Sequence, residues 1–135
     1  MDLESKAYEA RKENRSGSVK VDLRVKRVRF IDKRLFEAYS QLKQGKFEEK
    51  QLAENIDRAI ANLKENPLCG INVPRRLWPK EYVSKYGIDN LRKYDLPDGW
   101  RLLYTVVGNE IEIISVLLEW LKHKDYEKRF GYKVR

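Results

Sequence analysis

Cysteine and histidine are almost absent from this chain of 135 residues, which contains one of each. A single cysteine excludes an intramolecular disulfide framework and a thiolate metal cluster. Cys69 follows Leu68 and precedes Gly70, and we expect it to be a small buried filler rather than a nucleophile. No apolar run approaches the ~18–20 residues that cross a bilayer. Residues 1–18 also lack the apolar core of a signal peptide, so we expect a cytoplasmic protein with no membrane partner.

Acidic residues are too few to balance the basic ones, at 21 Asp and Glu against 29 Lys and Arg, for a formal net charge of +8. The charge is uneven, because residues 47–66 are net acidic while both flanking segments are net basic. Clustered Lys and Arg bind polyanions by neutralising phosphates. A surface charged only for solubility has the same composition. Composition therefore leaves a nucleic-acid partner and a solvated surface open.

The length fits one domain that can bury an apolar core. Residues 1–18 are strongly charged and end in Ser16, Gly17 and Ser18, which break any regular pattern. We therefore expect a charged N-terminal arm over residues 1–18 and one folded domain over residues 19–135.

Apolar and charged residues alternate from Val19 to Val25, which is the period of a half-buried strand over residues 19–30. The phase then slips, because Val28 and Phe30 occupy even positions. A bulge near Lys26 and Arg27, or the end of regular pairing, would absorb that slip.

Two helices are predicted next. Asp32 is a suitable N-cap for a helix that ends at Gly45. Residues 47–64 carry apolar side chains at spacings of three and four, and Pro67 follows their end. Two helices joined this closely should form an antiparallel hairpin that packs on a sheet. Residues 67–89 are rich in proline and irregular, with one short helical stretch around residues 79–86.

Three strands are predicted over residues 91–96, 100–107 and 110–118. Residues 97–99 supply turn chemistry, and Gly108 with Asn109 predicts a two-residue hairpin loop. Residues 120–135 form a basic helix or tail. The expected fold is α+β: a helix hairpin packed on a small, twisted, mostly antiparallel sheet, in the order β-α-α-β-β-β plus a C-terminal helix or tail.

Four sequence elements occur in a consistent order from residue 92 onward. They are the pair Arg92 and Lys93, the strand Trp-Arg-Leu-Leu-Tyr at 100–104, the apolar strand 111–118, and His-Lys-Asp-Tyr at 123–126. In this order the chain resembles the RelE/ParE toxin superfamily over roughly residues 19–130. The ending with His and Tyr three residues apart is closest to the HigB-like branch of the RelE toxins. The arm 1–18 and the long segment 67–89 depart from a minimal toxin.

The resemblance implies a toxin of a toxin–antitoxin pair, acting as a metal-independent mRNA endoribonuclease (an mRNA interferase) on the ribosome. Its partners would be mRNA, the ribosome and a cognate antitoxin, and it needs no cofactor and no metal. Two alternatives remain. One is a RelE-fold module that binds RNA or protein without nuclease activity, and the other is a ParE-like inhibitor of DNA gyrase.

Three residues are the catalytic candidates that the resemblance implies. Arg101 would stabilise the transition state, since a guanidinium grips two phosphate oxygens; the alternative is a surface pair with Glu112 across the hairpin. His123 would act as general acid or base, or would be solvated. Tyr126 would stack on a base or donate a proton, or would pack in the core under a terminal helix.

Five basic residues are the RNA-binding candidates: Arg92, Lys93, Lys124, Lys128 and Arg129. Arg92 and Lys93 are neighbours on one strand, so their side chains point to opposite faces and only one can face the site. The others would position phosphates.

Overall fold

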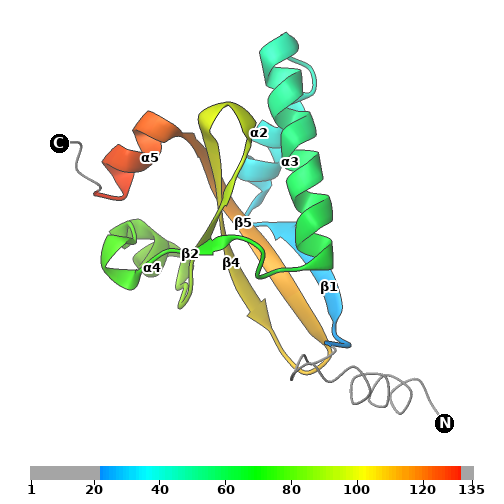
Figure 1. Cartoon of the computed structure of the whole chain (residues 1–135), viewed down its shortest axis with the longest axis vertical. Helices are drawn as coiled ribbons and strands as arrows, with labels where there is room; N and C mark the ends of the chain where they lie inside the picture. The colour runs from blue at the N-terminus through cyan, green and yellow to red at the C-terminus, as the bar shows by residue number, and fades with distance from the viewer. Residues whose placement is uncertain (1–21, 132–135) are drawn as a thin grey trace, which may run out of the picture.

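The computed structural model describes residues 22–131, so the predicted arm 1–18 lies outside the described residues. Five strands form one mixed sheet in the order β1-β5-β4-β3-β2, with helices on both faces (Figure 1). Within the described part, no helix is long and apolar enough to cross a membrane. The α+β prediction is confirmed. In chain order the elements are β1 (Val25–Phe30), α2 (Lys33–Leu42), α3 (Phe47–Glu65), β2 (Ile71–Asn72), the 3-10 turn η1 (Arg75–Leu77), α4 (Lys80–Tyr86), β3 (Arg92–Asp95), the 3-10 turn η2 (Pro97–Gly99), β4 (Trp100–Gly108), β5 (Glu112–Lys122) and α5 (His123–Arg129).

Strand β5 lies inside the sheet, antiparallel to β4 and parallel to β1. All other pairs are antiparallel, so the sheet is mostly antiparallel as predicted. The pairing of β1 with β5 is continuous from Val25 to Phe30, and the bulge predicted near Lys26 is therefore wrong. Regular pairing instead begins at Val25, the residue after which the alternation in the sequence changes phase.

The helix hairpin covers one face of the sheet. The Asp32 side chain accepts a hydrogen bond of 2.9 Å from the Leu35 backbone N–H, which is the predicted N-cap. On α3 the apolar spacing directs Ile56 and Leu63 fully into the core. Burying one such side chain contributes about 1.5–3 kcal/mol. The core on this face contains Tyr39, Leu52, Ile56, Ala59, Leu63, Leu96, Leu102, Tyr104 and Leu117.

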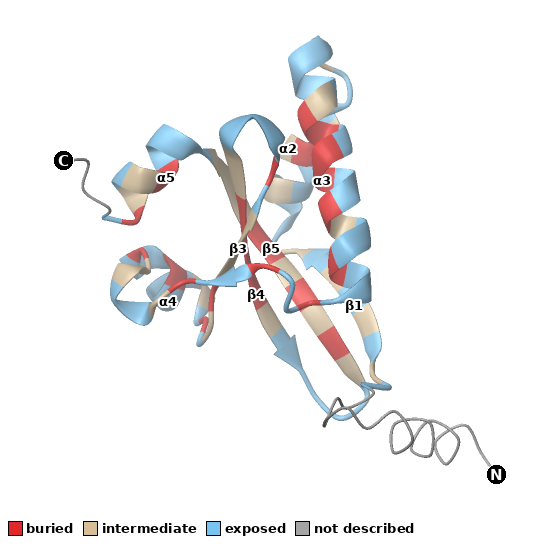
Figure 2. Cartoon of the chain, viewed as in Figure 1, coloured by how far each residue is buried: buried red, intermediate tan, exposed pale blue. Residues whose placement is uncertain are grey.

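A second core lies on the opposite face, under α4 and α5. Successive residues of β4 point to alternate faces, so Leu102 belongs to the first core and Leu103 to the second. Figure 2 shows buried segments on α3, on α5 and along β5. The second core contains Val73, Tyr82, Ile88, Leu91, Leu103, Leu118, Tyr126 and Phe130.

The buried hydroxyl of Tyr104 anchors the chain between α3 and β2. It donates a hydrogen bond of 2.7 Å to the Pro67 carbonyl and accepts one of 2.9 Å from the Gly70 N–H. At Gly70 an added Cβ would lie 2.7 Å from the Lys93 carbonyl oxygen and 2.7 Å from the Tyr104 ring. Only glycine permits this approach. The short helix predicted around residues 79–86 is confirmed as α4, and Gly87 ends it in the left-handed region at φ 62°.

Two local predictions are wrong. The loop between β4 and β5 is not a two-residue turn, because β4 ends at Gly108 and β5 begins at Glu112. The Asn109 side-chain oxygen accepts hydrogen bonds from the backbone N–H groups of Ile111 and Glu112, a local bond that asparagine favours in turns. Cys69 is exposed rather than buried, since it lies in the surface loop after α3.

Candidate active site on the α5 face of the sheet

Arg101 and His123 lie in direct contact. Arg101 is on β4 and points away from the helix hairpin, whereas His123 is the first residue of α5, directly after β5. The Arg101 Nη2 atom is 3.0 Å from the His123 Nδ1 atom. The Arg101 side chain is 18% exposed and that of His123 is 51% exposed. The alternative pair of Arg101 with Glu112 is wrong, because Glu112 binds Arg27 at 2.9 Å and Leu121 lies opposite Arg101.

One carboxylate lies between two cations beside this pair. The Asp95 Oδ1 atom is 3.2 Å from Lys93 Nζ and 3.2 Å from Arg101 Nε. The Arg101 Nε–H is buried and does not point at that oxygen well enough for a hydrogen bond, so the contact is an ion pair. Lys93 and Asp95 are two apart on β3, which places both side chains on one face. Sequence reasoning missed Asp95, although this spacing was a readable signal.

The ring of Tyr126 lies beneath the two cations. Lys93 Nζ and the Arg101 guanidinium carbon each lie 5.8 Å from the ring centroid, within the range of a cation–π contact. The residue is 3% exposed, and its ring stacks on Phe130 at 4.5 Å. The structure therefore places the ring in the second core, as the packing alternative expected. A catalytic role for Tyr126 stays a prediction.

Glu127 is the second site residue that sequence reasoning missed. Its Oε2 atom is 3.1 Å from His123 Nε2, one helical turn along α5. The available signal was the spacing of four residues on a predicted helix. Carboxylate, imidazole and guanidinium thus form one continuous polar chain from α5 to β4. Among the described residues, no three His, Cys, Asp or Glu side chains gather in a group able to hold a metal ion.

Arg92 and Lys93 point to opposite faces, as expected from strand geometry. Lys93 faces the site. Arg92 instead donates to the carbonyl oxygens of Gly70 at 2.6 Å and Leu68 at 3.2 Å, and so holds the loop after α3. These two hydrogen bonds give Arg92 a structural role.

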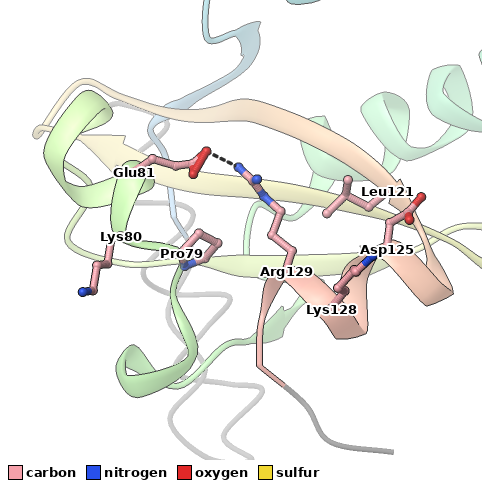
Figure 3. A pocket seen from close by; sticks show the side chains of 7 residues that line it. All are labelled: Pro79, Lys80, Glu81, Leu121, Asp125, Lys128 and Arg129. Carbon is pink, nitrogen blue, oxygen red and sulfur yellow. Dashed lines mark hydrogen bonds and ion pairs between the residues drawn. The ribbon is translucent and has the colours of Figure 1, made fainter.

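Arg129 is held by two carboxylates. It donates to Glu81 at 2.6 Å and to Glu119 at 3.0 Å, which ties α5 to α4 and β5. Figure 3 shows the guanidinium turned toward Glu81, while Lys128 lines the same depression. Tyr82 also donates a short hydrogen bond to Glu119. Burial is the largest cause that raises the pKa of Tyr82 far above its ordinary value. Lys124 and Lys128 are exposed.

The chain matches one protein family, described as "ParE toxin of type II toxin-antitoxin system, parDE", over residues 19–118. No curated protein and no solved structure matches it. The match spans most of the chain, so this protein is a toxin of a toxin–antitoxin pair. It belongs to the ParE toxin family, and the resemblance to the RelE/ParE superfamily is confirmed. Membership of a type II family implies a cognate antitoxin. The matched range includes Lys93, Asp95 and Arg101 and ends before His123 and Tyr126.

Proposed function

We propose that this toxin is a metal-independent mRNA endoribonuclease that acts on the ribosome, with Arg101 and His123 as its catalytic residues. The observation that carries the proposal is the 3.0 Å contact between Arg101 Nη2 and His123 Nδ1. In this proposal His123 accepts a proton and Arg101, beside it on a partly open face, binds a phosphate. Cleavage of RNA by its own 2′-hydroxyl needs these two functions at one position.

The chemistry follows from the two roles. His123 takes the proton of the 2′-hydroxyl, and the 2′-oxygen forms a bond to phosphorus. The bond from phosphorus to the 5′-oxygen breaks, and water supplies the proton that this oxygen needs. The guanidinium of Arg101 and the ammonium of Lys93 stabilise the negative charge that gathers on the phosphorane oxygens. The products are a 2′,3′-cyclic phosphate and a 5′-hydroxyl.

Exposed cations around the site supply the RNA surface in this proposal. Lys124 and Lys128 lie on α5, the helix that begins at His123, and would bind phosphates without reading sequence. The ring of Tyr126 supports Lys93 and Arg101 from below and holds them at the surface. An antitoxin with an extended acidic segment would cover the same basic face and block it.

A second candidate function is inhibition of DNA gyrase by protein contact. Two observations favour it. The matched family is the ParE family, and its match ends before His123. In addition, Asp95 and Glu127 already pair with the cationic and imidazole groups of the site. A protein-contact inhibitor would need neither His123 nor a 2′-hydroxyl.

Controlled expression in a bacterial host separates the two functions. The wild type, Arg101→Gln, His123→Gln and the control Lys50→Gln, an exposed residue on α3, are induced from one promoter. Growth, mRNA 5′-ends and plasmid supercoiling are measured. The proposal predicts arrest with new mRNA ends for the wild type and the control only. Arrest with intact mRNA and altered supercoiling would support gyrase inhibition, and no arrest from soluble, folded wild type would reject both.

A further inference from the structure

The hydrogen bonds around His123 determine where its proton lies. Arginine has only donors, so the Arg101 Nη2–H that is 3.0 Å from Nδ1 requires Nδ1 to be the acceptor. A neutral imidazole then carries its proton on Nε2. That atom is 3.1 Å from Glu127 Oε2, which is an acceptor. Both contacts are satisfied by one tautomer, whereas a proton on Nδ1 would place two donors against each other.

We infer that Glu127 is a positioning residue that holds His123 in the Nε2–H tautomer and thereby makes Nδ1 the proton-accepting atom of the site. The identity of the proton, that of an RNA 2′-hydroxyl, rests on the proposed function. The tautomer does not, because it follows from the two contacts alone. Nδ1, the nitrogen that would accept the proton, faces the Arg101 guanidinium, where a bound phosphate would lie.

This arrangement couples the two catalytic residues. While Arg101 donates to Nδ1, that lone pair is occupied and cannot accept another proton. An RNA phosphate that draws Nη2 toward its own oxygens releases Nδ1 at the same moment, so the base becomes free only when substrate is bound. Once Nδ1 has taken the proton it no longer accepts from Arg101, which keeps the guanidinium on the phosphate. Glu127 then faces an imidazolium and stabilises its positive charge.

The chain contains one histidine, so the imidazole ¹⁵N signals in an NMR spectrum belong to His123 alone. The test is a long-range ¹H–¹⁵N correlation on the full chain at about pH 8, where an ordinary histidine is neutral. The wild type should show the Nε2–H pattern. Glu127→Ala should show a smaller share of the Nε2–H tautomer, because only the Arg101 contact then favours it. Glu127→Gln should restore the wild-type pattern, because its amide oxygen also accepts. The control Glu54→Ala, an exposed residue on α3, should leave the pattern unchanged.

A wild-type spectrum dominated by the Nδ1–H tautomer would overturn the inference, and so would a Glu127→Ala spectrum identical to the wild type. Circular dichroism checks that each variant is folded. If the protein cuts RNA, Glu127→Ala should lower kcat by about tenfold, a part of what a general base contributes. KM should change little, and Glu127→Gln should recover most of the rate. If no RNA is cut, the proposed function fails while the tautomer measurement still decides this inference.

Discussion

Arg101 and His123 are 22 residues apart in the chain, and the pairing of β4 with β5 brings their side chains to 3.0 Å. At the end of this pairing Trp100 lies opposite Lys122, and the next residue of β4 is Arg101 while the next residue after β5 is His123. The site is therefore built at the point where the hairpin ends and α5 begins. Any change that shifts this register would separate the two residues.

Replacing Asp95 with Asn should tighten RNA binding. The Asp95 carboxylate oxygen sits between Lys93 and Arg101, at the place where a phosphate oxygen would bind both cations. An exposed ion pair is worth about 0.2–1 kcal/mol, so the affinity should rise by roughly 1.5- to 5-fold at low salt. The measurement is the binding of a 2′-deoxy-substituted, uncleavable oligonucleotide, with Asp89→Asn as a control of equal charge change. Weaker binding by Asp95→Asn would show that the carboxylate holds Arg101 in place instead.

Replacing Tyr104 with Phe should destabilise the fold. The hydroxyl is fully buried, and its loss leaves the Pro67 carbonyl and the Gly70 N–H without their partner. An unsatisfied buried group costs about 1–3 kcal/mol. Urea unfolding measures the change. The matched control is Tyr94→Phe, whose hydroxyl only accepts from the exposed Asn62 side chain and should cost less than about 1 kcal/mol. Equal effects of the two variants would contradict this account.

Stability should fall in alkaline solution. Burial raises the pKa of Tyr104 to about 12 and raises that of Tyr82 further. Unfolded tyrosine ionises near ~10. The unfolded chain therefore loses these protons first, and the free energy of unfolding declines as the pH rises above about 10. For Tyr104 this decline ends at about 12. Urea unfolding across this range should show a shallower decline for Tyr104→Phe, and an identical slope would reject the assignment.

Replacing Arg129 with Ala should loosen α5. The guanidinium bridges Glu81 and Glu119, and without it Glu119 keeps only the Tyr82 hydroxyl as a partner among its described contacts. We expect a loss of about 1–3 kcal/mol, in the range for hydrogen bonds to charged groups. Lys128→Ala, one residue earlier and exposed, should stay within about 0.5 kcal/mol. Thermal unfolding compares the two. If Arg129→Ala is as stable as the wild type but binds RNA less tightly, Arg129 is an RNA contact rather than a structural bridge.

Periodicity was enough to predict the helix hairpin. The apolar spacing on α3 and the Asp32 cap of α2 depend on nearby residues only, so both could be predicted from the sequence. The alternation of side chains along β4 also places Arg101 on the face opposite that of Leu102, which belongs to the first core. These elements agree with the structure because local preference and burial favour the same conformation.

The contacts of the site could not be predicted in this way, because they depend on strand register. The loop from Gly108 to Glu112 is longer than a two-residue turn, and the β4–β5 pairing shifts once more between Leu103 and Tyr104. A two-residue loop at Gly108 and Asn109 would have placed Val116 opposite Arg101, whereas the longer loop and the shift place Leu121 there. Register depends on turn geometry and on which face is buried, which residue types alone do not specify.

The most direct test of the Arg101–His123 pair is cleavage of mRNA on programmed ribosomes by the purified protein, with the new RNA ends analysed chemically. We predict fragments that carry a 2′,3′-cyclic phosphate and a 5′-hydroxyl, formed at least about 100-fold more slowly by folded His123→Gln. Intact mRNA with folded wild-type protein, or cleavage by His123→Gln at the wild-type rate, would contradict the proposed site.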